Sequence, residues 1–288
     1  MQTQSASRAP LVTHPDAFPP AIPGVHIEGS GTAVVLLHSS MSSRKQWREL
    51  IERMRGGYRM IAIDMLGYGD APAPERPSWF SLADEVRRIE SVLAPALRAN
   101  ERFHVVGHSY GGVIGMQLAQ ALPQRVRSLT LFEPIPFHLL PERDPVVAEM
   151  HAVRREIEAR LRDGDAAGGA ACFVDYWSGR GAFSQLPRER QADLVKLLPK
   201  TVLEIRAVAG EPKSGERYRQ IGVPACLLSG CFSPPAAHLA TAVLGGLLPQ
   251  ARRFEVAAGH LAPATHPEQV NPIIEYFIRA TDQRSQGS

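Results

Sequence analysis

Cysteine is scarce in this sequence, and its spacing excludes several classes of protein. The 288 residues include three cysteines, Cys172, Cys226 and Cys231. They form no C-x-x-C pair and no cluster with other metal-ligating residues, so the pattern supports neither a zinc site nor a disulfide framework. We therefore expect reduced thiols, no metal site and a cytoplasmic protein.

Long apolar runs and a charge excess of one sign are also missing. No run of 18 apolar residues occurs, so no membrane span is expected. The first residues, MQTQSASRAP, lack the basic and apolar regions of a signal peptide. The 32 basic and 29 acidic residues are interspersed and leave a net charge of +3, which gives a nucleic-acid partner no support. The sequence predicts a globular chain that acts on a small molecule, with a homodimer as one open option.

The most informative stretch covers residues 102–118. Phe103, Val105 and Val106 form an apolar run that predicts a buried strand, Gly107–Gly111 follows as G-x-S-x-G, and apolar residues then recur with helical spacing. A turn this tight leaves no room for side chains at its two glycines, and it holds the Ser109 hydroxyl exposed at a helix N-terminus. The alternative is a chance glycine-rich turn.

With this strand, turn and helix, the chain resembles the α/β-hydrolase superfamily over about residues 25–280. The resemblance implies an α/β fold: a mostly parallel, doubly wound sheet with a helical cap insertion. Further apolar runs at 33–37, 60–64, 126–132, 225–229 and 253–256 predict its other strands. We expect a flexible N-terminal arm at 1–22, a core at 23–133 and 223–288, and a cap at 134–222. Helical patterns around 150–161, 188–198 and 202–208 fill the cap.

The predicted strand 33–37 runs into His38, Ser39 and Ser40. In the superfamily this position usually contains His-Gly-x, and the residue after the glycine donates a backbone N–H to the oxyanion hole. Here serine replaces the glycine. The resemblance therefore implies Ser40 and Tyr110 as oxyanion donors, with Ser39 as the alternative to Ser40. The segment 43–46 that follows has the pattern of a helix capping box.

A serine nucleophile needs a base and a group that orients the base. Of ten histidines, His260 follows the last predicted strand and matches the family's chain order of serine, acid, histidine. His104 and His108 are too close to the serine in sequence, and His38 resembles the packing histidine of the oxyanion loop. His260 is therefore the predicted base.

The acid is displaced from its usual place. Family members most often carry it shortly after the strand that corresponds to 225–229, but this chain has Ser233 there and no Asp or Glu between Val223 and Arg253. Glu133 ends the strand after the elbow helix, where certain haloalkane dehalogenases place their acid. We assign Glu133 as the group that orients His260, with a turn glutamate as the alternative. Asp64 is expected to be structural, binding backbone in a turn.

These residues predict a serine hydrolase that needs no cofactor or metal. Relatives that open epoxides or remove halides use Asp, because serine attack at a saturated carbon would leave an ether with no route to turnover. The prediction is cleavage of an ester or related acyl bond of a small, largely apolar substrate through an acyl-enzyme. Thioester, lactone, amide and carbon–carbon cleavage, acyl transfer and perhydrolysis stay open, as does a non-catalytic binding protein.

Candidate pocket residues come from the start of the insertion and from its aromatic cluster. The segment with Phe137 and His138 leaves the sheet beside Glu133, so it should lie near the site. Aromatic residues gather at Phe173, Tyr176 and Trp177. Two interpretations stay open: these rings form the core of the cap, or some of them, with Phe137 and Met41, line an apolar pocket for an uncharged acyl or aromatic substrate.

Overall fold

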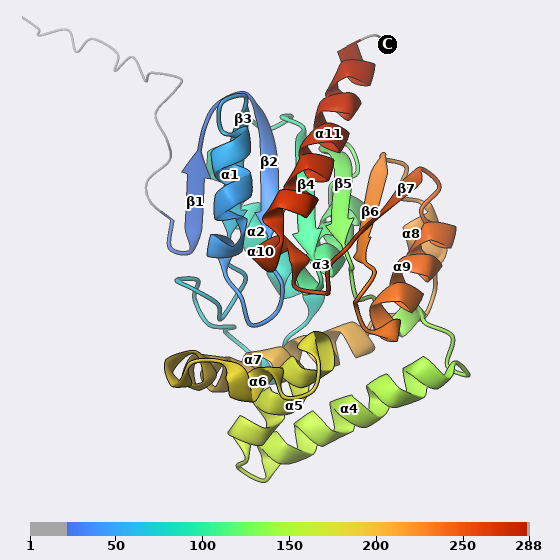
Figure 1. Cartoon of the computed structure of the whole chain (residues 1–288). Coiled ribbons are helices and arrows are strands. Elements are labelled where there is room, and N and C mark those ends of the chain that lie inside the picture. The colour runs from blue at the N-terminus through green and yellow to red at the C-terminus, as the bar shows by residue number, and fades with distance from the viewer. Residues whose placement is uncertain (1–21, 287–288) are drawn as a thin grey trace, which may run out of the picture.

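A computed structural model describes residues 22–286, so the predicted arm lies outside the described residues except for Ile22. Its centre is a seven-stranded sheet (Figure 1). The strands are β1 Val25–Glu28, β2 Thr32–Leu37, β3 Tyr58–Ile63, β4 Phe103–His108, β5 Val126–Phe132, β6 Ala225–Gly230 and β7 Ala251–Val256. Only the first strand pair, β1 with β3, is antiparallel. The predicted α/β architecture is confirmed.

The strand order decides where a site can form. The order is β1-β3-β2-β4-β5-β6-β7, so the chain winds outward from β2 in one direction and from β4 in the other. Between such a pair the loops at the carboxyl ends diverge to opposite faces and leave a crevice. The residues after β2 are His38–Ser40, and the residue after β4 is Ser109. The topology thus brings the two predicted oxyanion segments to one place.

Helices cover both faces of the sheet, which explains why its strands are apolar throughout. On β2, Val35 and Leu37 pack on one face with α2 and α3, whereas Val34 and Leu36 pack on the other with α1 and α11. The helices of these two layers are α1 Arg48–Met54, α2 Leu82–Ala96, α3 Tyr110–Ala121, α8 Glu216–Arg219, α9 Pro235–Leu247, α10 Ala262–Thr265 and α11 Pro267–Gln286.

The insertion between β5 and β6 forms a separate helical layer across the end of the sheet (Figure 1). This cap layer consists of α4 Pro145–Arg162, α5 Ala166–Ser178, α6 Ala182–Gln185 and α7 Arg188–Ala209. It has a core of its own, which includes Ile157, Leu198 and Val202. The last part of the insertion returns to the main core, where Tyr218 and Ile221 pack beside the sheet helices.

Two local predictions need correction, and one helix of the cap was not predicted. The hydroxyl of Ser43 makes no capping bond, because the segment begins as a 3-10 turn, Arg44–Trp47, and the Gln46 side chain turns instead to Ser39. The stretches predicted around 188–198 and 202–208 are one helix, α7, with Pro199 inside it. Helix α5, which carries the aromatic cluster, had no separate prediction.

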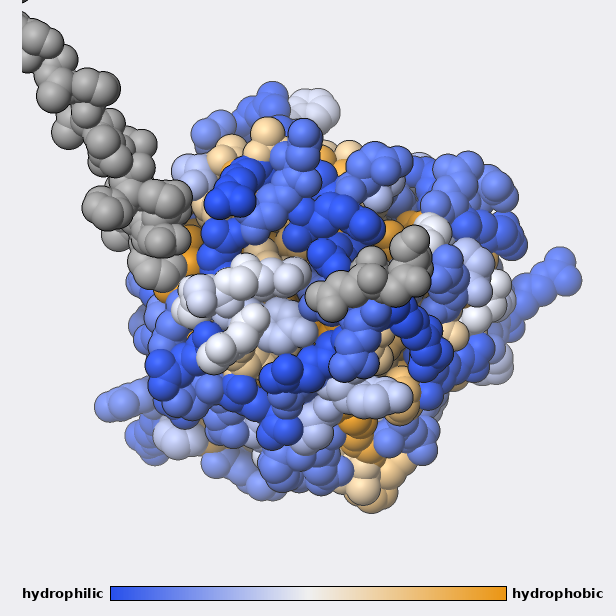
Figure 2. Space-filling view, turned by 90° about the horizontal axis from the view of Figure 1, so that it is seen from above, coloured by the Kyte–Doolittle hydropathy of each residue, from blue (hydrophilic) through white to orange (hydrophobic). Residues whose placement is uncertain are grey.

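The surface at the end of the sheet opposite the cap shows how polar and apolar side chains are distributed there. Figure 2 views the molecule from that end of the sheet, and the visible surface there is mainly hydrophilic, with hydrophobic side chains in small separate areas. Among residues 22–286, no helix combines the length and the hydropathy that crossing a bilayer requires.

Candidate active site

The turn after β4 has the strained geometry that the sequence predicts. Ser109 has a φ of 54°, outside the usual range for a residue with a side chain. A Cβ at Gly107 would lie 2.5 Å from the Gly111 carbonyl oxygen, and a Cβ at Gly111 would lie 2.4 Å from the Leu37 carbonyl oxygen. The expected collision at both glycines is therefore confirmed. The turn places Ser109 immediately before the N-terminal end of α3.

The structure brings three predicted residues into one hydrogen-bonded row. His260 Nε2 lies 3.0 Å from Ser109 Oγ, and His260 Nδ1 lies 2.7 Å from Glu133 Oε2. All three side chains are buried. An ionised carboxylate only accepts hydrogen bonds, so the ring carries its proton on Nδ1 and leaves Nε2 free to accept the serine proton.

Glu133 is held for this contact from both sides. Its second carboxylate oxygen, Oε1, accepts the backbone N–H of Gly230 at 2.7 Å, and its own N–H donates to the Leu228 carbonyl at 2.9 Å. Its φ is 40°. In the described part of the chain, the non-glycine residues with positive φ are Met41, Ser109 and Glu133. Each residue held in such a conformation costs about 1–3 kcal/mol, and residues of this kind cluster at functional sites.

The peptide group between Ser39 and Ser40, in the loop after β2, is held by His38. His38 donates from Nδ1 to the Ser39 carbonyl at 2.7 Å and accepts the Met65 N–H on Nε2 at 3.1 Å. Because a trans peptide points its C=O and N–H in opposite directions, the N–H of Ser40 is turned away from His38. The N–H of Ser39 already donates to Gln46 at 3.3 Å. The geometry therefore favours Ser40 over Ser39 as the second donor beside Tyr110.

A buried charged cluster from the cap contacts this loop. The Ser40 hydroxyl donates to Glu204 Oε2 at 2.6 Å, and Glu204 Oε1 accepts from Lys200 at 2.7 Å. Lys200 also donates to Glu85 on α2 at 3.0 Å. Burial raises the pKa of the Glu85 carboxyl. The one cation thus satisfies two carboxylates, and it lies over the Tyr110 ring at 5.1 Å.

Two further rings support His260. The indole of Trp177 stacks on its imidazole, with centroids 4.2 Å apart and an interplanar angle of 27°. On the core side, His108 donates from Nε2 to the His260 carbonyl at 2.8 Å. Burial lowers the pKa of His108 well below its usual range, so this ring stays neutral beside the base. The base is therefore fixed through its ring, its backbone and Glu133.

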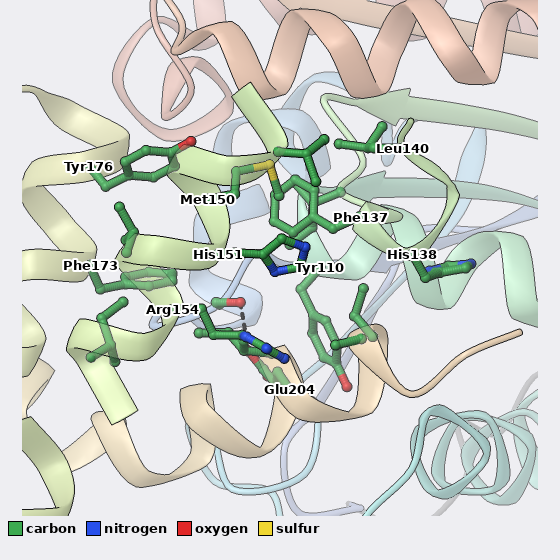
Figure 3. Close-up of a pocket in the computed structure, with 18 of the residues that line it drawn as sticks. Tyr110, Phe137, His138, Leu140, Met150, His151, Arg154, Phe173, Tyr176 and Glu204 are labelled. Atoms are coloured by element: carbon green, nitrogen blue, oxygen red, sulfur yellow. Dashed lines mark hydrogen bonds between the residues drawn. The ribbon is translucent and has the colours of Figure 1, made fainter. Parts of the chain in front are cut away.

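A cavity of about 250 Å³, here called the cap pocket, opens beside the predicted oxyanion donors (Figure 3). Ser40 and Tyr110 line one side, and Phe137, Phe173 and Trp177 supply much of the apolar wall. Phe137 stacks on Trp177 with centroids 6.0 Å apart. The aromatic residues therefore pack against one another and also line the pocket. Both interpretations of the sequence, packing within the cap and lining of a pocket, describe these rings.

A second cavity, here called the outer groove, reaches the other side of the base. It has a volume of about 640 Å³ and is lined by His260, Trp177, Gly259, Leu261 and the exposed Phe232. Trp177 lines both cavities. The predicted oxyanion donors therefore line the cap pocket and the base lines the outer groove, while Ser109 lines neither cavity.

The other predicted residues fall in different places. Phe137, His138 and Trp177 line the cap pocket, but Met41 does not: its buried side chain packs into the cap core with Leu198. The ring of His138 bonds the Tyr218 hydroxyl at 2.9 Å. Asp64 accepts the backbone N–H groups of Arg44 at 2.6 Å and Asp70 at 3.0 Å, which is the structural role expected of it.

The sequence analysis missed charged residues in and next to the pocket: Arg154 and Glu204 line it, and Lys200 lies beside it in contact with Glu204. Lys200 and Glu204 are spaced i, i+4 on α7, and Arg154 follows Met150 by four residues and precedes Ile157 by three on α4. Arg154 therefore shares the buried stripe of its helix. That signal was available, because an arginine within an apolar stripe must either find a partner or face a cavity.

Comparison with known proteins places the chain in a family. The sequence profile of the family described as alpha/beta hydrolase fold matches residues 32–267. The chain belongs to this family. The relatives that it matches carry names that include lysophospholipase, haloalkane dehalogenase, carbamate hydrolase and decarboxylase. The chain spans about a quarter of the length of the first of these relatives.

Individual relatives differ in how much of the chain they share. "Probable lysophospholipase BODYGUARD 1" from Arabidopsis thaliana is 33% identical over 114 residues, which cover 38% of this chain and 24% of that protein. A protein of Azorhizobium caulinodans with the provisional name carbamate hydrolase RutD is 28% identical over 270 residues, 89% of this chain and 95% of its own. The solved structure of a thermophilic esterase from Thermogutta terrifontis shares the fold with a TM-score of 0.69, at 21% identity over 89% of this chain and 93% of that one.

Proposed function

We propose that the protein is a serine hydrolase that cleaves an ester or related acyl bond of a small, largely apolar substrate. Ser109 is the nucleophile, His260 the base and Glu133 the group that orients the base. The observation that carries the proposal is the row of contacts from Ser109 Oγ to His260 Nε2 at 3.0 Å and from His260 Nδ1 to Glu133 at 2.7 Å. Neither a metal nor an organic cofactor takes part.

The proposed cycle has two halves. His260 takes the proton of Ser109 as Oγ attacks the carbonyl carbon, and the N–H groups of Ser40 and Tyr110 stabilise the oxyanion. His260 then protonates the leaving group, which departs and leaves the acyl-enzyme. A water molecule, deprotonated by the same ring, attacks the acyl carbon, and collapse returns the proton to Ser109 and releases the acid.

The two cavities suit the two parts of such a substrate. The leaving group receives its proton from His260, so it should lie on the side of the outer groove. The carbonyl oxygen lies at Ser40 and Tyr110, which line the cap pocket. We therefore assign the cap pocket to the acyl part of the substrate. The apolar rings of Phe137 and Trp177 favour an acyl group that is mostly hydrocarbon.

A fluorophosphonate probe tests the proposal directly, because it reacts with an activated serine and needs no knowledge of the substrate. The probe is expected to label the wild-type protein at Ser109 and to leave the Ser109→Ala variant unlabelled. A panel of nitrophenyl esters, acyl thioesters and amides then measures turnover of both proteins. Labelling of a different residue, or equal hydrolysis by the Ser109→Ala variant, would overturn the proposal.

The non-catalytic alternative gives a different result in the same assay. A protein that only binds its ligand would leave Ser109 unreactive toward the probe and would turn over no member of the panel. Circular dichroism of the Ser109→Ala variant serves as the control, because loss of the hydroxyl alone should leave the fold intact.

A further inference from the structure

Arg154 lines the largely apolar cap pocket, and no described residue forms an ion pair with it. Its side chain extends from α4 toward the side of the pocket where Tyr110 and Glu204 lie (Figure 3). Its Nε is buried and has no hydrogen-bond partner among residues 22–286. A buried donor on a charged group is costly to leave without an acceptor, and the described residues supply none to this Nε, so a bound ligand is the natural source of one.

The nearby carboxylates are already engaged. Both oxygens of Glu204 are used, one by Lys200 at 2.7 Å and the other by the Ser40 hydroxyl at 2.6 Å. Glu158, one turn along α4 from Arg154, pairs with Arg206 at 3.2 Å. Glu142, which also lines the pocket, pairs with Lys213. Among the charged residues that line this pocket, Arg154 is the one whose charge no described residue balances.

We propose that Arg154 binds a carboxylate on the acyl part of the substrate, so that the enzyme prefers acyl groups that end in a second acid. The inference rests on the proposed function and on the assignment of the cap pocket to the acyl group. A guanidinium presents two parallel N–H donors that match a carboxylate, and its attraction is strong in a pocket with apolar walls. The hydrocarbon between the scissile carbonyl and the carboxylate then packs against Phe137, Phe173 and Trp177.

Matched pairs of esters test the preference. The first member of each pair is a monoethyl ester of a dicarboxylic acid from succinate to suberate, and the second is the isosteric ester in which an isopropyl group replaces the carboxylate. Arg154→Met keeps the length of the side chain but removes the charge. It should lower kcat/KM for the best half-ester roughly tenfold to a hundredfold relative to the neutral partner.

Two variants serve as controls. Arg155→Met removes the exposed neighbouring arginine on the same helix and should change neither rate. Arg154→Lys keeps the charge without the paired donors, so it should fall between wild type and Arg154→Met, and it preserves the test if Arg154→Met fails to fold. Parallel loss of both rates in Arg154→Met, or equal effects of the two arginine positions, would overturn the inference.

Calorimetry separates this inference from the proposed function. The half-ester is titrated into the Ser109→Ala variant, which cannot turn it over, and into the same variant carrying Arg154→Met. Binding that requires Arg154 supports the carboxylate site whatever reaction follows. If neutral esters are hydrolysed through Ser109 but Arg154 affects neither binding nor rate, the proposed function stands and the carboxylate site is wrong.

Discussion

The hydroxyl of Ser40 donates to the carboxylate of Glu204 at 2.6 Å, and this contact joins the loop of the predicted oxyanion hole to the cap. The two residues are 164 positions apart in the chain. Glu204 is buried and also holds Lys200. The position of the cap and the position of the Ser40 peptide are therefore linked through one carboxylate.

The first prediction concerns this link. Ser40→Ala keeps the backbone N–H but releases the loop from Glu204, so we expect kcat to fall about tenfold with little change in KM. Ser39→Ala is the matched control, because its hydroxyl bonds only Gln46, at 3.1 Å. Steady-state kinetics on one neutral ester measures both variants. A fall in kcat that is equal in the two variants would argue against the link.

Glu204 itself should matter for stability. Glu204→Ala removes one partner of a buried ion pair and leaves the Ser40 hydroxyl without its acceptor, so the free energy of unfolding should drop by about 3 kcal/mol. Urea denaturation of the folded variant measures this drop. Glu204→Gln, which keeps an acceptor for Ser40, should lose less. A Glu204→Ala variant as stable as wild type would show that the ion pair of Glu204 with Lys200 does not stabilise the fold.

The assignment of the acid is tested by two carboxylates in parallel. Glu133→Gln removes the charge that holds the proton on His260 Nδ1, so kcat should fall roughly a thousandfold or more. Asp64→Asn should affect mainly stability, because Asp64 binds the backbone of Arg44 and Asp70 and does not touch the His260 ring. Kinetics and thermal unfolding of both variants check the contrast. The reverse pattern would overturn the assignment of Glu133.

Substitution of two aromatic residues of the pocket should have different effects on the kinetics. Phe137→Ala is expected to change the preference for acyl length more than it changes turnover of the smallest ester, because Phe137 contacts the pocket but not His260. Trp177→Ala removes the ring that stacks on His260 at 4.2 Å, so it should lower kcat for every ester as well. Rates along a series of acyl lengths distinguish the two. Parallel losses along the series in Phe137→Ala would make that residue purely structural.

Stability should depend on pH through the buried histidines. Burial lowers the pKa of His38 from 6.5 to about 4. As the pH falls from 6.5 to about 4, the unfolded chain gains a proton that the folded chain does not, so the free energy of unfolding falls and then levels off. His38 alone accounts for about 3 kcal/mol over this window.

The measurement is urea denaturation at several pH values across that window. His38→Asn keeps a donor and an acceptor but does not titrate. Its stability should be lower than that of wild type at neutral pH and should depend less steeply on pH. An unchanged slope would show that His38 is not the group responsible.

Much of the site could be predicted from local sequence. The turn around Ser109 is specified by its glycines, whose missing side chains leave room for the carbonyls of Gly111 and Leu37. Glu133 directly follows β5 and His260 comes four residues after β7, and the carboxyl ends of parallel strands meet at one edge of the sheet. The absence of any acid between 223 and 253 pointed to Glu133.

Other features were decided only by the tertiary structure. The preference for Ser40 over Ser39 follows from the bonds that His38 and Gln46 make to the loop after β2. The place of Met41 in the cap core and the direction of Arg154 depend on how the cap lies on the sheet. That placement results from the packing of side chains far apart in the chain, such as Ser40 against Glu204. Local patterns specify which residues form an element and which of its faces is buried. They do not specify which distant side chain a buried polar group will meet, because many pairings satisfy the same periodicity and only packing of the whole chain selects one.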